Sequence, residues 1–149
     1  FVGWNTKADG SGETLSAPYT YTITDDLVLY AQYAANENNV TFDKQGGIGG
    51  TDGVNAIYES PMPSGSMITA PTKIGYSFQG YYRYTDGNGT KYYNADMSSA
   101  CEWNLSDDTT LFAYWLANEY TVTLNKQNGI GGTDSIRATY QNCLRGVVR

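Results

Sequence analysis

Hydrophobic and polar residues alternate with a period of two along much of the chain. Val40 and Phe42, for example, alternate with the polar residues Thr41 and Asp43. Because successive side chains of a strand point to opposite faces, this period predicts half-buried β-strands. The segments that share the pattern are 40–43, 54–58, 76–84, 111–115 and 136–140.

Glycine-rich and proline-rich segments separate these strands. Gln45–Gly50 lies between the first two, and Thr85–Gly89 predicts a hairpin turn because Asp-Gly and Asn-Gly supply the positive φ of tight turns. Prolines bracket Ser64–Ala70, where we expect a short helix or an ordered crossover. The fold is therefore predicted to be mainly β, with α+β as the alternative. The expected core residues are Val40, Phe42, Ile57 or Tyr58, Ile68, Tyr76, Phe78, Trp103, Leu105, Leu111 and Trp115.

The chain also repeats itself. Val40–Tyr58 returns as Val122–Tyr140 with 12 of 19 positions identical, and Phe1–Trp4 matches Phe78–Tyr81. Internal repeats of this kind indicate tandem structural units. The predicted parts, joined by short linkers, are the C-terminal half of a repeat at 1–34, a complete repeat at 38–116 and the N-terminal half of a repeat at 120–149.

Composition excludes several classes of function. The net charge is −6 with nine basic residues, which disfavours a nucleic-acid or anionic-lipid partner. Histidine is absent, which removes Ser-His-Asp and Cys-His catalysis and imidazole metal sites. No apolar run is long enough to insert in a membrane. We therefore expect no enzyme, no cofactor and no metal.

The ends and the cysteines add little chemistry. The chain starts at Phe1 and shows no signal peptide, which indicates a piece of a longer protein. Cys101 and Cys143 are too few for a metal site, so two free thiols or one disulfide remain as alternatives.

The most suggestive candidate site is a group of tyrosines around the predicted hairpin. Tyrosine has a flat apolar face and a hydroxyl, which suit it to sugars and protein interfaces. The alternative is that some of these rings cover the core while the others form cross-strand pairs. The residues of this candidate ligand or interface surface are Tyr81, Tyr82, Tyr84, Tyr92 and Tyr93.

Two other segments have both a functional and a structural interpretation. Asp86–Thr90 alternates oxygen ligands as calcium loops do, but Met97 occupies the place of the closing glutamate, so a hairpin turn explains it better. Lys44 and Lys126 recur at equivalent strand ends. An isopeptide crosslink would need a buried lysine, whereas the glycines that follow indicate a solvated strand end.

Three motifs occur in order within the complete repeat. Val-Thr-Phe-Asp-x-x-Gly-Gly opens it at Val40, Gly-Tyr-x-Phe-x-Gly-Tyr occupies Gly75–Tyr81, and Leu-Phe-Ala-Tyr-Trp closes it at Leu111–Trp115. This series resembles the Listeria–Bacteroides repeat family, the B-repeat of internalin-type bacterial surface proteins. The glycine loop is longer here by Ile48–Gly50, and Leu144–Arg149 departs from the repeat pattern.

The resemblance implies a β-grasp-like (ubiquitin-like) sheet in secreted, extracellular units of the bacterial cell envelope. It implies a non-catalytic stalk, spacer or adhesion module, with no catalytic residues to carry over. The expected partners are neighbouring repeats of the same chain and, for adhesion, a host or matrix protein or a glycan. The alternative function is a carbohydrate- or glycan-binding module that uses the tyrosine-rich hairpin.

Overall fold

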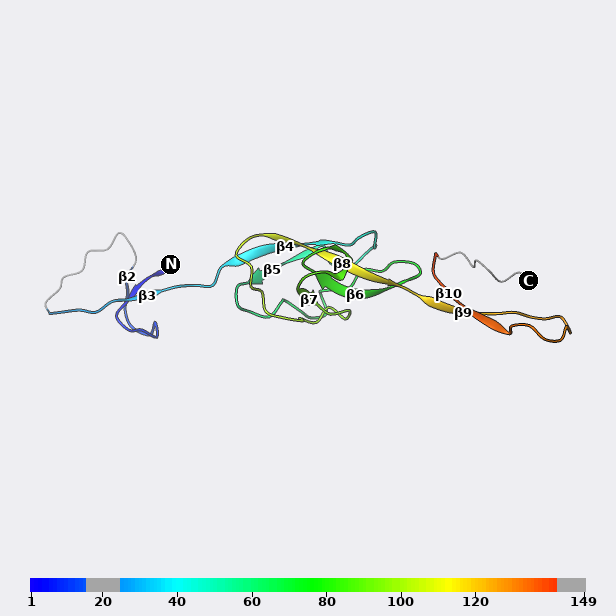
Figure 1. Cartoon of the computed structure of the whole chain (residues 1–149). Helices are drawn as coiled ribbons and strands as arrows, with labels where there is room; N and C mark the ends of the chain where they lie inside the picture. Colours follow the sequence, from blue (N-terminus) through cyan, green and yellow to red (C-terminus); the bar gives the residue numbers. More distant parts are fainter. Residues whose placement is uncertain (16–24, 142–149) are drawn as a thin grey trace. The chain divides into compact units, whose positions relative to one another are not determined.

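The computed structural model describes residues 1–15 and 25–141, which form strands and turns (Figure 1). The chain divides into two compact units, Phe1–Asn36 and Glu37–Arg149. Within the described residues the only helical segment is the short 3-10 helix η1 (Thr85–Gly87). The mainly β prediction is confirmed. The crossover at Ser64–Ala70 is ordered without a helix, so the α+β alternative is wrong for the described part of the chain.

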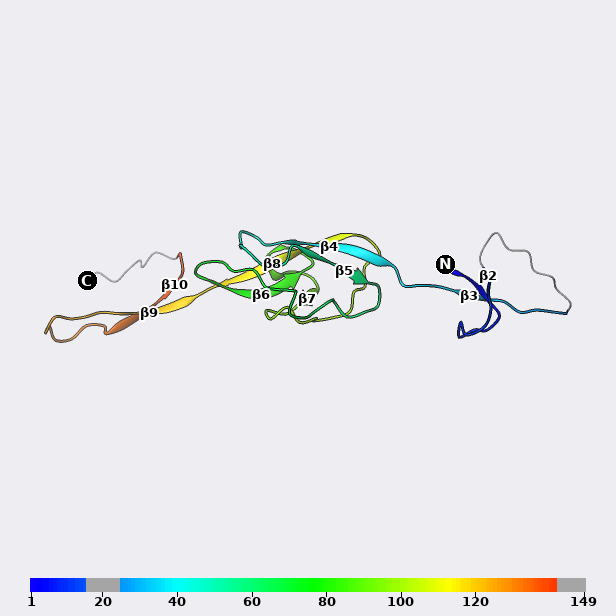
Figure 2. The ribbon, with the colours of Figure 1, turned by 180° about the vertical axis from the view of Figure 1, so that it is seen from behind.

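The second unit contains a five-stranded sheet. Two of its interior strands, β4 and β8, are parallel neighbours, and its other pairs are antiparallel. These two strands come first and last in the complete repeat, and Figures 1 and 2 show them side by side. The order β5-β4-β8-β6-β7 is formed by β4 (Glu37–Asp43), β5 (Gly53–Ile57), β6 (Tyr76–Tyr82), β7 (Lys91–Tyr93) and β8 (Thr109–Ala117).

One face of this sheet carries the hydrophobic core. The predictions for Val40, Phe42, Trp103 and Leu111 are confirmed, since all four are buried. Ile68, Phe78, Leu105 and Trp115 are partly buried against the same cluster, and Tyr76 is half-buried. The alternatives Ile57 and Tyr58 were both wrong. Ile57 is 49% exposed because its neighbour Ala56 points inward, and Tyr58, which is 37% exposed, follows the end of β5.

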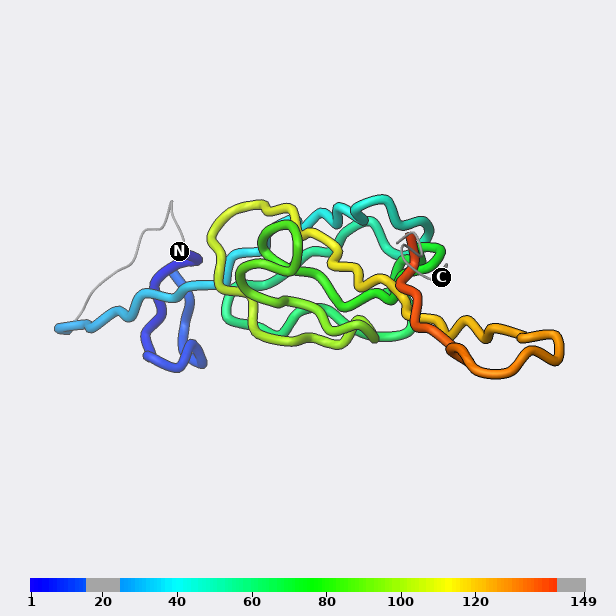
Figure 3. Tube along the Cα trace, turned by 45° about the vertical axis from the view of Figure 1, so that its right-hand side comes forward, coloured from blue at the N-terminus to red at the C-terminus, as the bar shows by residue number. Residues whose placement is uncertain are grey.

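A separate hairpin follows the sheet. It consists of β9 (Glu119–Thr123) and β10 (Ser135–Thr139), and only Asn118 lies between β8 and β9 (Figure 3). Tyr120 pairs with Ala138, as Asn38 pairs with Ala56 at the equivalent positions of β4 and β5. The repeated sequence therefore adopts the same strand register twice.

The described residues of the first unit form a small three-stranded sheet. β1 (Gly3–Asn5) lies between β2 (Thr14–Leu15) and β3 (Tyr30–Gln32), the arrangement that β6 has between β7 and β8. Asn5 is buried, and its amide nitrogen donates to the carbonyls of Gly10 and Gly12. Its side-chain oxygen accepts from the backbone N–H of Lys7. This polar residue thus organises the turn of the first hairpin.

Candidate functional site

The tyrosine group divides between the core and the surface. Tyr81, Tyr92 and Tyr93 are at most 1% exposed, so the prediction of a ligand surface is wrong for these three rings. Tyr82 is half-buried and packs edge-on against Tyr114 at 5.8 Å between ring centroids, while Tyr84 is 57% exposed. A surface role stays a prediction for Tyr82 and Tyr84 alone.

A break in strand register explains why the sequence pattern misplaced Tyr81. The pairing of β6 with β8 shifts between Phe78 and Gly80. After the shift, odd-numbered residues of β6 point to the core in place of even-numbered ones. Tyr81 therefore stacks on Phe42, with ring centroids 4.3 Å apart, where strict alternation from Phe78 would have placed Tyr82. Period-two counting cannot detect such a bulge.

The three buried hydroxyls differ in their hydrogen bonding. Tyr93 donates to the carbonyl of Pro63 at 2.7 Å, and Tyr92 donates to Asn104 Oδ1 at 2.7 Å. The Tyr81 hydroxyl has no partner among the described residues. A buried hydroxyl without a partner loses its hydration and gains nothing in return.

We expect Tyr81→Phe to raise the free energy of unfolding by about 1 kcal/mol, because it removes an unpaired buried hydroxyl. The matched variant Tyr93→Phe should lower the free energy of unfolding by a similar amount, because the Pro63 carbonyl loses its hydrogen-bond donor. Chemical denaturation of both variants measures the difference. Equal destabilisation by the two changes would contradict this assignment.

Burial also changes the acidity of these tyrosines. It raises the pKa of Tyr81, with smaller contributions from the charges of Asp52 and Asp43, and it raises the pKa values of Tyr92 and Tyr93. Above about pH 10, the ordinary value, the unfolded chain therefore loses protons that the folded repeat keeps. The stabilisation is complete below that pH and decreases as the pH rises through the folded values.

The expected result is alkaline unfolding in which these three rings ionise together with loss of the fold. Ultraviolet absorbance of tyrosinate and near-ultraviolet circular dichroism, followed during one titration, measure both events. Ionisation of the three rings near pH 10 in a repeat that keeps its near-ultraviolet signal would contradict their placement in the core.

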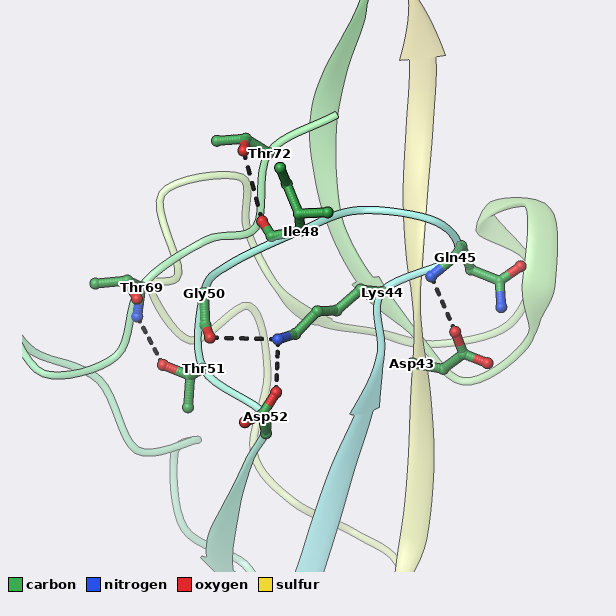
Figure 4. Close-up of polar contacts among 9 residues, drawn as sticks. All are labelled: Asp43, Lys44, Gln45, Ile48, Gly50, Thr51, Asp52, Thr69 and Thr72. Atoms are coloured by element: carbon green, nitrogen blue, oxygen red, sulfur yellow. Dashed lines mark hydrogen bonds and ion pairs between the residues drawn. The ribbon is translucent and has the colours of Figure 1, made fainter. Parts of the chain in front are cut away.

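The repeated glycine loop is closed by an ion pair (Figure 4). Lys44 Nζ lies 2.5 Å from Asp52 Oδ1 and donates to the Gly50 carbonyl at 3.4 Å. The equivalent residues of the hairpin, Lys126 and Asp134, form the same pair. Because Asp52 is 94% exposed, the pair adds little stability. Lys44 is engaged in loop closure, which accounts for its recurrence without an isopeptide crosslink.

The same loop is held against the crossover. Ile48 N–H donates to the Thr72 carbonyl and Thr72 N–H donates to the Ile48 carbonyl. Thr69 N–H donates to Thr51 Oγ1 beside them (Figure 4). Trp115 Nε1 also donates to the Lys44 carbonyl at 2.9 Å. These bonds join segments that are far apart in sequence and fix the loop conformation.

A surface pocket lies beside this loop, and sequence analysis did not identify it as a site. Lys73 Nζ donates to the Gln45 carbonyl at 2.9 Å and lies 4.8 Å from the Tyr76 ring centroid. Aromatic faces, an amide and a carboxylate meet here, which is chemistry suited to a polar ligand with apolar faces. The lining residues are Gln45, Lys73, Tyr76, Asp86, Ala113, Tyr114 and Trp115.

The remaining candidates show structural roles. Asp86–Thr90 forms the turn after β6, in which Tyr84 N–H donates to the Asn88 carbonyl. Within residues 1–15 and 25–141, no group of three or more His, Cys, Asp or Glu side chains could hold a metal ion. Cys101 is a free, half-buried thiol, and burial raises its pKa. Cys143 lies outside the described residues.

Comparison with known proteins agrees with these features. The model of the Listeria-Bacteroides repeat domain matches residues 1–32 and 39–114, so it covers most of the chain in two segments. The chain belongs to the Listeria–Bacteroides repeat family. This confirms the resemblance that the three ordered motifs indicated, while the boundaries of the three predicted parts stay a prediction.

Two proteins of known sequence are similar to this chain. A protein of Evansella cellulosilytica named "Putative Gly-rich membrane protein" is 32% identical over 97% of the chain, and Internalin H of Listeria monocytogenes is 34% identical over 63%. The chain spans 15% and 14% of the lengths of these two proteins. No solved structure matches it. In the described part of the chain, no helix has the length and apolar character needed to cross a membrane.

Proposed function

We propose that this chain is a non-catalytic segment of a bacterial cell-surface protein in which tandem repeats form a stalk or spacer. Its family and the printed names of its relatives, a membrane protein and an internalin, support a surface location. The observation that carries the spacer role is the path of the chain through the complete repeat. The protein's partners would then be the neighbouring repeats of the same chain.

The chain enters and leaves the complete repeat on two neighbouring interior strands of the sheet. It enters at Glu37 on β4 and leaves at Ala117 on β8, and the two strands are parallel from Val40↔Thr109 to Asp43↔Phe112. Tension applied at these points pulls parallel neighbours in opposite directions. All hydrogen bonds between the two strands then carry the load together and must break together. Such a repeat transmits tension without unfolding strand by strand.

Side chains extend this connection at the point where the chain enters. Asn38 Nδ2 donates to the Ser106 carbonyl at 2.9 Å, and Asn39 N–H donates to Asp108 Oδ1 at 2.7 Å. Asn38 Oδ1 also accepts from the buried Trp103 indole at 3.1 Å. The start of β4 is therefore fastened to the segment that precedes β8, where the paired Asp107 and Asp108 of the sequence lie.

The sheet order supports the finer fold assignment within this proposal. Counted within the complete repeat, the strands lie in the order second, first, fifth, third and fourth. This is the order of a β-grasp (ubiquitin-like) sheet, in which the first and last strands are also parallel neighbours. In this repeat an irregular crossover stands where such folds usually have a helix.

Stretching the whole chain by its ends in a single-molecule experiment tests the spacer role. We expect one high-force event that releases residues 37–117. The gain in length should equal the extended length of this segment, about 270–290 Å, minus its end-to-end length in the folded repeat. Asp108→Ala should lower this force because it removes the bond to Asn39, whereas Asp107→Ala serves as the matched control. Release of the repeat at low force, or in several small steps, would contradict the proposal.

The alternative is glycan binding, and the pocket beside Lys73 is the observation that favours it. Tyr82 packs against Tyr114, which lines this pocket together with Trp115 and Asp86. Sugars bind to aromatic faces flanked by carboxylates and amides. The tyrosine hairpin would then contribute through Tyr82, which packs against the lining residue Tyr114, rather than through the buried rings.

A glycan array probed with the chain tests this alternative. A sugar bound at the pocket should be lost in Tyr82→Ala and Asp86→Asn and retained in Ser64→Ala, which alters the exposed crossover. An array without hits, or binding that survives both pocket changes, would refute it.

A further inference from the structure

The junction between the complete repeat and the following hairpin is built from hydrogen bonds on both sides. Asn118 N–H donates to the Gly75 carbonyl at 2.9 Å, and Tyr140 N–H donates to the Asn118 carbonyl at 2.8 Å. Ser77 Oγ donates to Asn118 Oδ1 at 2.6 Å, and Asn118 Nδ2 donates to the Tyr120 hydroxyl at 3.3 Å. The single linker residue thus bonds to β6 and its preceding turn on one side and to the hairpin on the other.

Aromatic contact adds to these bonds. The rings of Tyr76 and Tyr140 meet edge to face, with centroids 5.4 Å apart. The Tyr76 hydroxyl donates to Gln141 Oε1 at 2.9 Å. Edge-to-face aromatic pairs stabilise a contact beyond the effect of the area they bury. The residues after β10 are therefore fastened to the start of β6.

Gly75 provides the space for the Tyr140 ring. Its φ is +78°, and a Cβ built on it would lie 2.3 Å from Tyr140 Cγ. Any side chain at this position would displace the ring. The glycine at the start of the Gly-Tyr-x-Phe motif is thus matched to a tyrosine that belongs to the following copy of the repeat.

The docking segment recurs at the equivalent place in the complete repeat. Tyr58 and Glu59 correspond to Tyr140 and Gln141 in the sequence alignment of the two copies. Glu59 has a φ of 57° and Gln141 a φ of 62°, so both copies make the same left-handed turn after the tyrosine. Each copy therefore presents its tyrosine in the same backbone geometry.

We propose that Gly75, Tyr76 and Ser77 form a docking surface for the next repeat, which inserts the tyrosine that follows its second strand. The partner that fits is a neighbouring copy with tyrosine at the position of Tyr140. The contact holds successive repeats at one orientation. This inference goes beyond the spacer role, because a chain with loose junctions would still resist tension within each repeat.

Spin-label distance measurements on the full chain test the docking surface. Labels at Asn55→Cys on β5 and Thr123→Cys on β9, with Cys101 and Cys143 replaced by serine, report the position of the hairpin relative to the sheet. We expect one narrow distance distribution. Gly75→Val and Tyr140→Ala should each broaden it several-fold, whereas Tyr84→Ala, on an exposed ring outside the junction, should leave it narrow.

A milder variant separates loss of docking from loss of structure. Tyr76→Phe keeps the ring and removes only the bond to Gln141, so it should broaden the distribution less than Tyr140→Ala. Circular dichroism of each variant checks that the sheet persists. A broad distribution in the unaltered chain, or a narrow one that survives both Gly75→Val and Tyr140→Ala, would overturn the proposal.

Discussion

Trp103→Ala is expected to lower the free energy of unfolding of the complete repeat by about 3–5 kcal/mol. Trp103 is 0% exposed, and its ring lies 5.1 Å from that of Tyr92. Alanine would leave a large cavity and remove the indole donor from the buried Asn38. Small domains are stable by only about 5–15 kcal/mol, so this loss is a large fraction of the total stability. Chemical denaturation followed by circular dichroism measures the loss.

Trp103→Phe is the graded control. It keeps most of the ring volume but removes the bond to Asn38 Oδ1, so a smaller loss of about 1–3 kcal/mol is expected. A Trp103→Ala variant that unfolds at the same denaturant concentration as the unaltered chain would contradict the position of Trp103 in the core.

Gly80→Ala is expected to cost about 3 kcal/mol or more, the upper end of backbone strain alone. Gly80 has a φ of +124°, and a Cβ there would lie 2.1 Å from the Tyr93 carbonyl oxygen. That oxygen belongs to the backbone of β7, so relief would require movement of a whole strand. Thermal and chemical unfolding of the variant would show the loss.

Gly65→Ala separates the cost of the backbone conformation from the cost of the clash with β7. Gly65 has a similar φ of +134°, but nothing lies within 4 Å of a Cβ built on it. It therefore shares the backbone cost and lacks the clash, and we expect a clearly smaller loss of stability. Equal losses in the two variants would show that the approach of β7 to Gly80 does not matter.

The Gly80 contact also explains part of the sequence motif. Gly3 occupies the equivalent position in the first unit, and a Cβ there would lie 3.0 Å from the Leu15 carbonyl oxygen. In both units the glycine lets the neighbouring strand approach. The glycine in the motif Phe-x-Gly-aromatic is thus explained by the close contact between adjacent strands of a hairpin.

Local patterns in the sequence were enough to predict most of the strands and the turn after β6. Alternation placed β4, β5 and β8, and the Asp-Gly and Asn-Gly pairs marked the turn after β6. The internal repeat predicted that β9 and β10 would copy β4 and β5, and their register agrees. These features depend on residues close together in the chain, so a single sequence contains them.

Contacts between distant segments could not be predicted in this way. The bulge in β6 changes which face of the sheet the following residues point to. Tyr81 therefore lies in the core, although the sequence pattern had assigned it to the candidate surface. Trp115 and Lys73 hold the glycine loop from positions far along the chain, and no local signal indicated this role. The contact of Tyr140 with Tyr76 likewise joins two copies of the repeat, so no local pattern could indicate it.

The claim that tension passes through two parallel interior strands, β4 and β8, is tested most directly by pulling the complete repeat in two directions. With Cys101 and Cys143 replaced by serine, one chain carries attachment points at Glu37→Cys and Ala117→Cys, which load β4 and β8 in shear. The other carries them at Glu37→Cys and Asp107→Cys, which separate the two strands from the same end. We predict an unfolding force several-fold higher for the first pair. Equal forces in the two directions would contradict the account.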